Sequence, residues 1–170
     1  MISKEEALHL VERTSKYQHA LIASAIMRKI AQRLGEDERC WEIVGLLHDL
    51  DYDLVKEDMT KNGVVASEML AHKLPSASLY AIKSHDYRTG FQPKSRLDNA
   101  LIVADTLASI IKKMDASVEL SVQRMEEEME RISAEKPWYK ANLQKAKELG
   151  LKASEVLRLG TELVRLMNSK

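Results

Sequence analysis

The sequence predicts an all-α fold, a bundle of helices with no sheet, and three observations lead to this expectation. The chain of 170 residues has only 6 Gly and 3 Pro to interrupt regular structure. Its apolar residues recur at the 3.6-residue spacing of a helix face. No sustained period-two alternation rich in β-branched residues favours a strand. We therefore expect helices over about residues 4–14, 17–34, 37–48, 63–72, 76–84, 95–114, 117–133, 138–149 and 153–168.

The first three helices are marked by boundary signals. Ser3 followed by Glu6 predicts a capping box that opens the first helix. The second helix begins at about Tyr17, and Gly35 is its C-terminal signal. A short acidic loop, residues 50–53, follows the third. These signals predict three helices joined by short turns.

The middle helices are separated by Pro75 and by a loop at residues 86–93. The run at residues 101–103 is apolar and resembles a strand by itself, but a helical stripe continues on either side of it. This stripe consists of Leu97, Leu101, Ala104, Ala108 and Ile111. It favours one helix over residues 95–114.

Beyond Asp115 the chain changes character. A strongly charged helix is expected to Ser133, Pro137 breaks it, and two further helices follow. The length suits one domain, residues 1–170. Within it we expect a core bundle, residues 1–114, and a helical extension, residues 115–170.

The charge balance argues against a nucleic-acid partner. The 26 Lys and Arg residues equal the 26 Asp and Glu residues, and the pI is near 7.0. Such a balance does not favour wrapping a polyanion or binding an anionic membrane. Aromatic residues make up only 5% of the chain, so base stacking is not expected to organise the molecule.

The remaining bulk features point to a cytoplasmic protein. Cys40 is the only cysteine, which excludes an intrachain disulfide and a zinc–thiolate cage. The N-terminus lacks the basic and apolar segments of a signal peptide. No apolar stretch is long enough to span a bilayer. We expect a soluble protein with no membrane partner, and homo-oligomer formation stays open.

Three polar residues lie on the apolar faces of three separate predicted helices. His19 shares its face with isoleucines at i+3, i+7 and i+11, His48 follows Val44 at i+4, and Asp105 follows Leu101 at i+4. Polar groups are costly in a core unless they find partners. A divalent cation is one such partner, because imidazole and carboxylate are both good metal ligands.

Asp49 directly follows His48. Neighbouring residues on a helix project about 100° apart, so the two can share one ion only at a helix end. The turn at residues 51–53 predicts such an end. The dipeptide by itself is a weak signal, since a second copy occurs at His85-Asp86.

The order His19, then His48-Asp49, then Asp105 resembles the H…HD…D signature of the HD superfamily of metal-dependent phosphohydrolases. The chain is most similar to the small HDIG-type proteins of that superfamily. The resemblance covers residues 16–114 well and residues 145–167 more loosely. It implies an HD-domain-like helical bundle in which these four residues bind the metal. The segments that carry it are residues 46–52, 81–85 and 101–107.

The chain departs from the family pattern at two positions. Asp51 stands where the name motif has Gly, and Asn62 stands where relatives with two metals have His. The missing imidazole favours a single metal. His85 matches a remaining member of the second-metal set, so a second position near it stays open.

The resemblance implies hydrolysis of a small phosphate ester, with a nucleotide as the favoured class, by water activated on the metal. Asp53 or His85 would transfer the proton, and Lys83 or Arg88 would hold the anion. The ion would be Mn, Fe, Co, Ni or Mg. Two alternatives from other classes stay open: a non-catalytic module that binds a nucleotide or a partner, and a di-iron oxygenase of the HD type.

Overall fold

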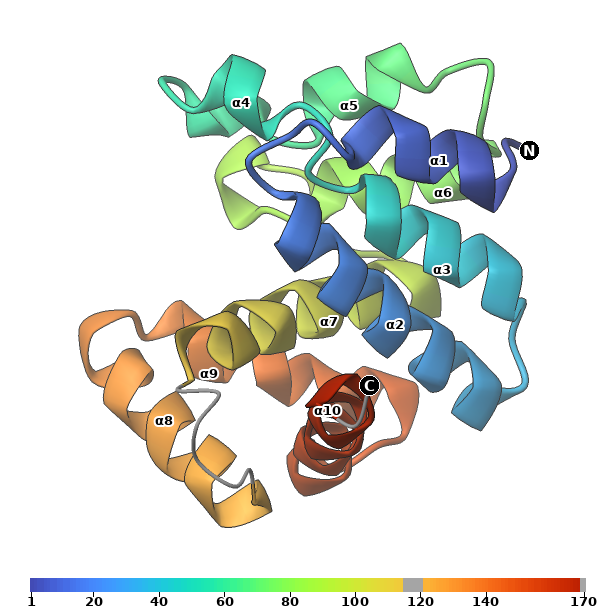
Figure 1. The fold of residues 1–170 in the computed structure, drawn as a ribbon. Helices are drawn as coiled ribbons and strands as arrows, with labels where there is room; N and C mark the ends of the chain where they lie inside the picture. The colour runs from blue at the N-terminus through green and yellow to red at the C-terminus, as the bar shows by residue number, and fades with distance from the viewer. Residues whose placement is uncertain (115–120, 169–170) are drawn as a thin grey trace.

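Three long helices form the centre of the molecule. They are α2 (Tyr17–Leu34), α3 (Glu38–Leu47) and α7 (Arg96–Lys113). In this computed structural model, which describes residues 1–114 and 121–168, α3 lies along α2 and both cross α7 (Figure 1). No strand occurs within the described residues, as the all-α prediction requires. The predicted bounds of the second helix, 17–34, are confirmed.

Gly45 allows α3 to approach α2 closely. A Cβ atom at this position would lie 2.8 Å from Met27 Cγ and 2.9 Å from Ser24 Cα. Only the absence of a side chain permits this contact. One turn later α3 ends, with His48 as its C-cap. The close approach therefore brings the end of α3 next to the first turn of α2, where His19 lies.

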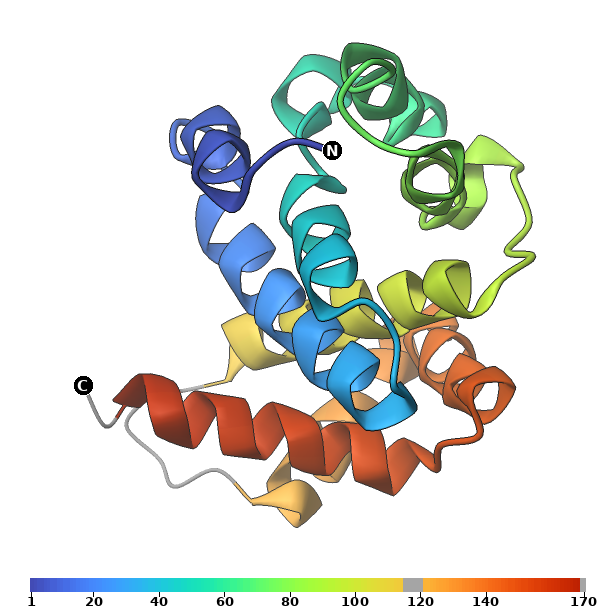
Figure 2. The same cartoon turned by 90° about the vertical axis from the view of Figure 1, so that its right-hand side faces the viewer.

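The remaining helices of residues 1–94 cover one end of this central unit (Figures 1 and 2). The predicted capping box of Ser3 and Glu6 is present. The bounds predicted for the helix after Pro75, residues 76–84, are also observed. The predicted loop after Leu50 is wrong in part, because Tyr52 opens a short helix. These elements are α1 (Lys4–Val11), α4 (Tyr52–Val55), η1 (Met59–Lys61), α5 (Val64–Met69), α6 (Ser76–Ser84) and η2 (Tyr87–Thr89).

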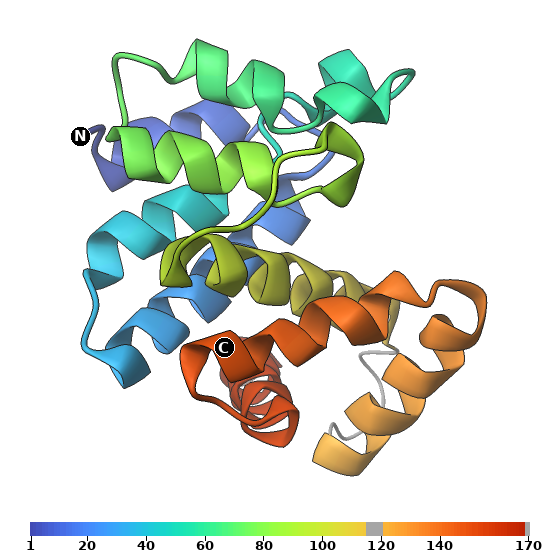
Figure 3. The same cartoon turned by 180° about the vertical axis from the view of Figure 1, so that it is seen from behind.

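The C-terminal helices cover the opposite face of α7 (Figure 3). The charged helix predicted at 117–133 runs over 122–135, and residues 117–120 lie outside the described part of the chain. The helix predicted at 138–149 tightens into a 3₁₀ turn after Gln144, and the last helix has its predicted bounds. These elements are α8 (Val122–Glu135), α9 (Trp138–Gln144), η3 (Lys145–Leu149) and α10 (Ala153–Asn168).

One set of buried apolar side chains runs through all these layers, from Ile2 to Val164. It includes Met125 and Leu143 of the C-terminal helices together with Leu107 of α7. The division into a core, 1–114, and an extension, 115–170, stays a prediction. Within the part of the chain that the structure describes, no helix has the length and apolarity needed to cross a membrane.

Candidate metal centre

The four predicted ligand residues meet at one point. His19 comes from the first turn of α2, His48 and Asp49 from the end of α3, and Asp105 from the middle of α7. One donor atom from each residue lies within 4.8 Å of the donor atoms of the other three. The three helices therefore deliver the donors from three directions to a common centre.

The spacing of these donors suits a single ion. His19 Nε2 lies 2.9 Å from Asp105 Oδ1 and 3.2 Å from His48 Nε2. His48 Nε2 lies 3.5 Å from Asp49 Oδ2 and 3.6 Å from Asp105 Oδ1. Ligands about 2.1 Å from an ion lie about 3.0 Å apart in an octahedron and about 3.4 Å apart in a tetrahedron. The nitrogen and oxygen donors thus fit a divalent cation.

The orientation of His48 is fixed by the backbone. Its Nδ1 lies 2.8 Å from the carbonyl oxygen of Gly45. Because a carbonyl can only accept, Nδ1 carries the proton and donates it, which leaves the Nε2 lone pair directed at the cluster. The tautomer required of a metal ligand is therefore set by the helix end that carries the residue.

The two carboxylates of the cluster are held in their ionised form. Burial acts to raise the pKa of Asp49, but His48, the hydrogen bond with His85 and the charge of Lys16 outweigh it and lower this pKa well below its ordinary value. Burial also acts to raise the pKa of Asp105, but the hydrogen bonds and charges of His19 and His48 outweigh it and lower this pKa strongly. Ionised carboxylates are the form that binds cations.

His85 lies beside the cluster on the side of Asp49. Its Nε2 is 3.3 Å from Asp49 Oδ1, and its ring meets that of His48 edge-on with centroids 5.0 Å apart. Burial would lower the pKa of His85, but the hydrogen bond and the charge of Asp49 raise it to about 9. The imidazole is therefore charged at neutral pH and donates to Asp49.

Asn62 occupies the place between Asp49 and His85. Its Nδ2 donates to Asp49 Oδ1 at 3.0 Å and lies 3.2 Å from His85 Nε2, a contact that is a hydrogen bond only when His85 is neutral. Its Oδ1 is buried and has no hydrogen-bond partner among the described residues. An amide is a poorer ligand for transition metals than the imidazole it replaces.

Asp51, the departure from the HDIG pattern, has a structural role. It is fully buried and accepts hydrogen bonds from the backbone N–H groups of Gly63, at 2.9 Å, and Ala66, at 2.8 Å. Burial raises the pKa of Asp51, and the two backbone donors act against this shift. Asp51 thereby fixes the start of α5 and, with it, the position of Asn62.

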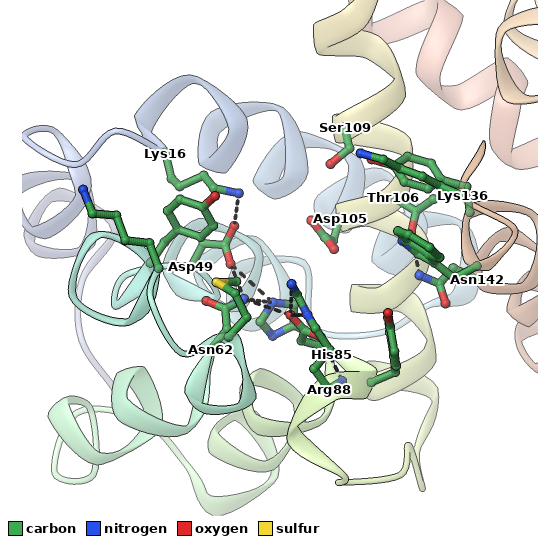
Figure 4. A pocket seen from close by; sticks show the side chains of 17 residues that line it. Lys16, Asp49, Asn62, His85, Arg88, Asp105, Thr106, Ser109, Lys136 and Asn142 are labelled. Carbon is green, nitrogen blue, oxygen red and sulfur yellow. Dashed lines mark hydrogen bonds and ion pairs between the residues drawn. The ribbon is translucent and has the colours of Figure 1, made fainter. Parts of the chain in front are cut away.

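A pocket of about 410 Å³ opens above the cluster (Figure 4). His19 and His48 are buried beneath it, whereas the side chain of Asp105 is 26% exposed. Solvent can therefore reach the cluster from this side. The cationic side chains that line the pocket are Lys16, Lys56, Arg88 and Lys136.

Two of the remaining predicted site residues lie outside this pocket. Lys83 places its ammonium group 5.4 Å from the centre of the Phe91 ring. Asp53 is exposed and accepts hydrogen bonds from the backbone N–H and the hydroxyl of Ser15, which lower its pKa. The structure thus does not bring Lys83 or Asp53 to the site, because their side chains are bound elsewhere.

Arg88, by contrast, lines the pocket. Asp86 holds its guanidinium through contacts of 2.9 Å to Nε and 2.5 Å to a terminal nitrogen. The second His-Asp dipeptide therefore has a different role from the first. Asp49 turns into the cluster, and Asp86 fixes a cation at the edge of the pocket.

Several pocket residues are not expected from the sequence. Lys16 places Nζ 2.9 Å from Asp49 Oδ2. Burial acts to lower the pKa of Lys16, but the carboxylate of Asp49 outweighs it and raises this pKa. The position of Lys16 three residues before His19, on the same face of a helix, is a signal that could have identified it. Trp138 and Asn142 come from the extension, and no local pattern links them to the cluster.

Comparison with known proteins agrees with the geometry. The family model described as HD domain matches residues 17–135, which include all four residues of the cluster. Searches of curated proteins and of solved structures each gave no significant match. Members of this family are generally metal-dependent hydrolases. The matched segment spans most of the chain, and the protein belongs to the HD domain family.

Proposed function

We propose that this protein is a metal-dependent phosphohydrolase that acts on a small phosphate ester, with a nucleotide as the favoured class. The observation that carries the proposal is the convergence of four donor atoms at the floor of a pocket lined by cations. The volume of about 410 Å³ is in the range of small-molecule sites. The preference for a nucleotide follows from the resemblance to the family.

In this proposal His19, His48, Asp49 and Asp105 hold the metal ion. When bound, a divalent ion supplies a water of lowered pKa and offsets charge on the phosphoryl group. Asp49 has both oxygens engaged, one toward the cluster and one toward Asn62 and His85. This fixes the carboxylate and restricts where a water beside it can lie.

Lys16 and Arg88 would hold the phosphoryl oxygens. Lys16 Nζ is next to Asp49 and lies 3.9 Å from the centre of the Tyr52 ring, which supports its side chain. Arg88 is pre-oriented by Asp86. Charge-assisted hydrogen bonds from such groups are stronger than neutral ones. Lys16 therefore takes the role that the sequence suggested for Lys83.

His85 would supply a proton to the leaving oxygen. It lines the pocket, and the carboxylate of Asp49, whose Oδ1 lies 3.3 Å from His85 Nε2, raises its pKa and favours the protonated imidazole. A protonated imidazole within reach of the ester is a suitable general acid. Asp53 has no part in this scheme, since its carboxylate faces Ser15.

The test combines metal analysis with a screen of phosphate esters. Asp49→Ala should lose bound metal and lower turnover at least a hundredfold, because it removes a ligand. Asp53→Ala, an exposed aspartate nearby, should retain both metal and turnover. Equal metal content and turnover in Asp49→Ala and the unmodified protein would refute the proposal, provided circular dichroism shows both folded.

The same measurements separate the alternatives. Bound metal without turnover of any ester would indicate a binding module. Two irons per chain in protein purified without air would indicate an oxygenase. The amide of Asn62 beside His85 argues against the second iron.

A further inference from the structure

One wall of the pocket comes from the C-terminal extension. Lys136, Trp138, Tyr139 and Asn142 all line it. Figure 4 shows Lys136 and Asn142 across the pocket from Lys16 and Asp49. The HD domain match ends at residue 135. The wall therefore lies beyond the segment that matches the family model.

The wall is attached to the helix that carries a candidate metal ligand. Asn142 Nδ2 donates to the hydroxyl of Thr106 at 3.1 Å, and Thr106 directly follows Asp105 on α7. Trp138 precedes Asn142 by four residues on α9, so the two side chains share a helix face. The position of Trp138 is thus fixed relative to the cluster.

Trp138 meets Tyr87 at the edge of the pocket. Their ring centroids are 6.1 Å apart and their planes are inclined by 48°. Both rings remain open to solvent, with 40% of Trp138 and 59% of Tyr87 exposed. Tyr87 belongs to η2 and Trp138 to α9, so the two rings come from separate parts of the chain and meet at one place.

Aromatic residues are concentrated at this pocket. The chain has eight of them, and Tyr52, Tyr87, Trp138 and Tyr139 all line it. Exposed aromatic rings gathered beside a polar site are typical of ligand recognition. The low aromatic content of the chain predicted that stacking would not organise the molecule. That content is an average over all residues, however, and the fold brings half of the aromatic rings to one pocket.

We propose that Trp138 and Tyr87 form an aromatic clamp, two rings in contact whose exposed faces stack against a planar ring in the alcohol half of the phosphate ester. This inference rests on the proposed function and makes the extension the element that selects the substrate. The ligand chemistry is a flat aromatic group, either a nucleobase or a simple aryl ring. Stacking of one base on an aromatic side chain is worth about 5- to 150-fold in affinity.

The kinetic test compares three esters, namely a nucleoside 5′-monophosphate, phenyl phosphate and ribose 5-phosphate, which has no aromatic ring. Trp138→Ala should lower the preference for the first two over the third by about 5- to 100-fold in kcat/KM, mainly through KM. Trp138→Phe should restore most of it. Phe91→Ala, which removes an exposed ring outside the pocket, should preserve the preference.

The three esters also distinguish the two sources of the ring. A larger loss for the nucleoside monophosphate than for phenyl phosphate supports the clamp as a nucleobase site. An equal loss for both supports it as an aryl site. An equal loss for all three esters, ribose 5-phosphate included, overturns the clamp.

A binding test is independent of hydrolysis. The chain has two tryptophans, and Trp41 is only 5% exposed, so a ligand ring can quench Trp138 alone. Nucleoside monophosphate should quench the emission of the purified full chain, ribose 5-phosphate should not, and Trp138→Phe should abolish the effect. Quenching without hydrolysis would leave the clamp standing and refute the proposed function. No quenching would overturn the clamp whether or not esters are hydrolysed.

Discussion

At the scale of single residues, the two His-Asp dipeptides show how equal sequences acquire different tasks. His48 and His85 both cap a helix, and each donates its Nδ1 proton to the carbonyl oxygen three residues earlier. Both Nε2 atoms therefore point away from the helix toward Asp49. The difference lies in the following aspartates, because Asp86 pairs with Arg88.

The pairing of Asp86 with Arg88 can be tested by Asp86→Asn. The variant keeps the size of the side chain but removes the charge that orients the guanidinium, so we expect KM for the ester to rise roughly tenfold. Metal content should stay unchanged, since Asp86 is not in the cluster. Steady-state kinetics and metal analysis check this. A loss of metal would show that the second dipeptide also serves the ion.

The charge of His85 predicts a pH dependence of stability in protein stripped of metal by a chelator. Its pKa rises from 6.5 to about 9 on folding, so its contribution is fully present below pH 6.5 and is lost as pH rises to about 9. The unfolding free energy should fall by about 3 kcal/mol over this range. Denaturant titrations at several pH values measure it.

His85→Gln and His72→Gln serve as the pair of variants for this measurement. The first removes the buried imidazole and should abolish the pH dependence between 6.5 and 9. The second removes an exposed one and should retain it. Parallel curves for the unmodified protein and His85→Gln would contradict the assignment.

At the scale of helices, local signals define most boundaries and fail where tertiary contacts decide. Ser3, Gly35 and Pro75 each act within a few residues of the helix end they mark, and these three ends are confirmed, whereas the first helix ends at Val11 and not at residue 14. The segment after Asp51 was not. Its course depends on the bonds from Asp51 to Gly63 and Ala66, twelve and fifteen residues away.

The contact of α3 with α2 predicts the effect of Gly45→Ala. The new methyl group would meet Met27 and the backbone of residues 23 and 24 at 3.0 Å or less. We expect a loss of about 1–3 kcal/mol in stability and weaker metal binding, because His48 would move away from His19. Thermal denaturation and metal titration measure both effects.

Gly160→Ala is a suitable control for that variant. It also lies within a helix, but the nearest atoms are the flexible ends of Met125 and Leu107 at 3.0 and 3.2 Å. The loss of stability should be smaller and metal affinity unchanged. If Gly160→Ala weakened metal binding as much as Gly45→Ala, the effect would be one of general stability.

At the scale of the whole molecule, the sequence predicts the floor of the site better than its walls. His19, His48, Asp49 and Asp105 were identifiable because each lies on or beside an apolar helix face and in a family order. Lys83 and Asp53 are close to the predicted site in sequence, yet their side chains contact other residues. The wall of α9 depends on packing between distant helices, which periodicity does not encode.

An ion that joins α2, α3 and α7 should stabilise the entire fold. At a free metal concentration of 100 times Kd the gain is about 2.7 kcal/mol, which for a chain of this length corresponds to roughly 5–10 °C in Tm. Differential scanning calorimetry with and without Mn²⁺ measures the shift. His19→Ala should remove it, and His72→Ala should preserve it.

The end of the HD domain match at residue 135 has a consequence for how such a protein can be altered. The ligands of the ion and the wall of α9 are encoded in separate stretches of the chain, and the hydrogen bond of Asn142 to Thr106 and the buried side chain of Leu143 hold this wall against α7. Exchange of residues 136–144 with Asn142 and the buried Leu143 retained should therefore redirect the choice of substrate while the ligands of the ion stay in place. Residues 136–144 are in this sense a segment that can be exchanged to change specificity without altering the metal centre.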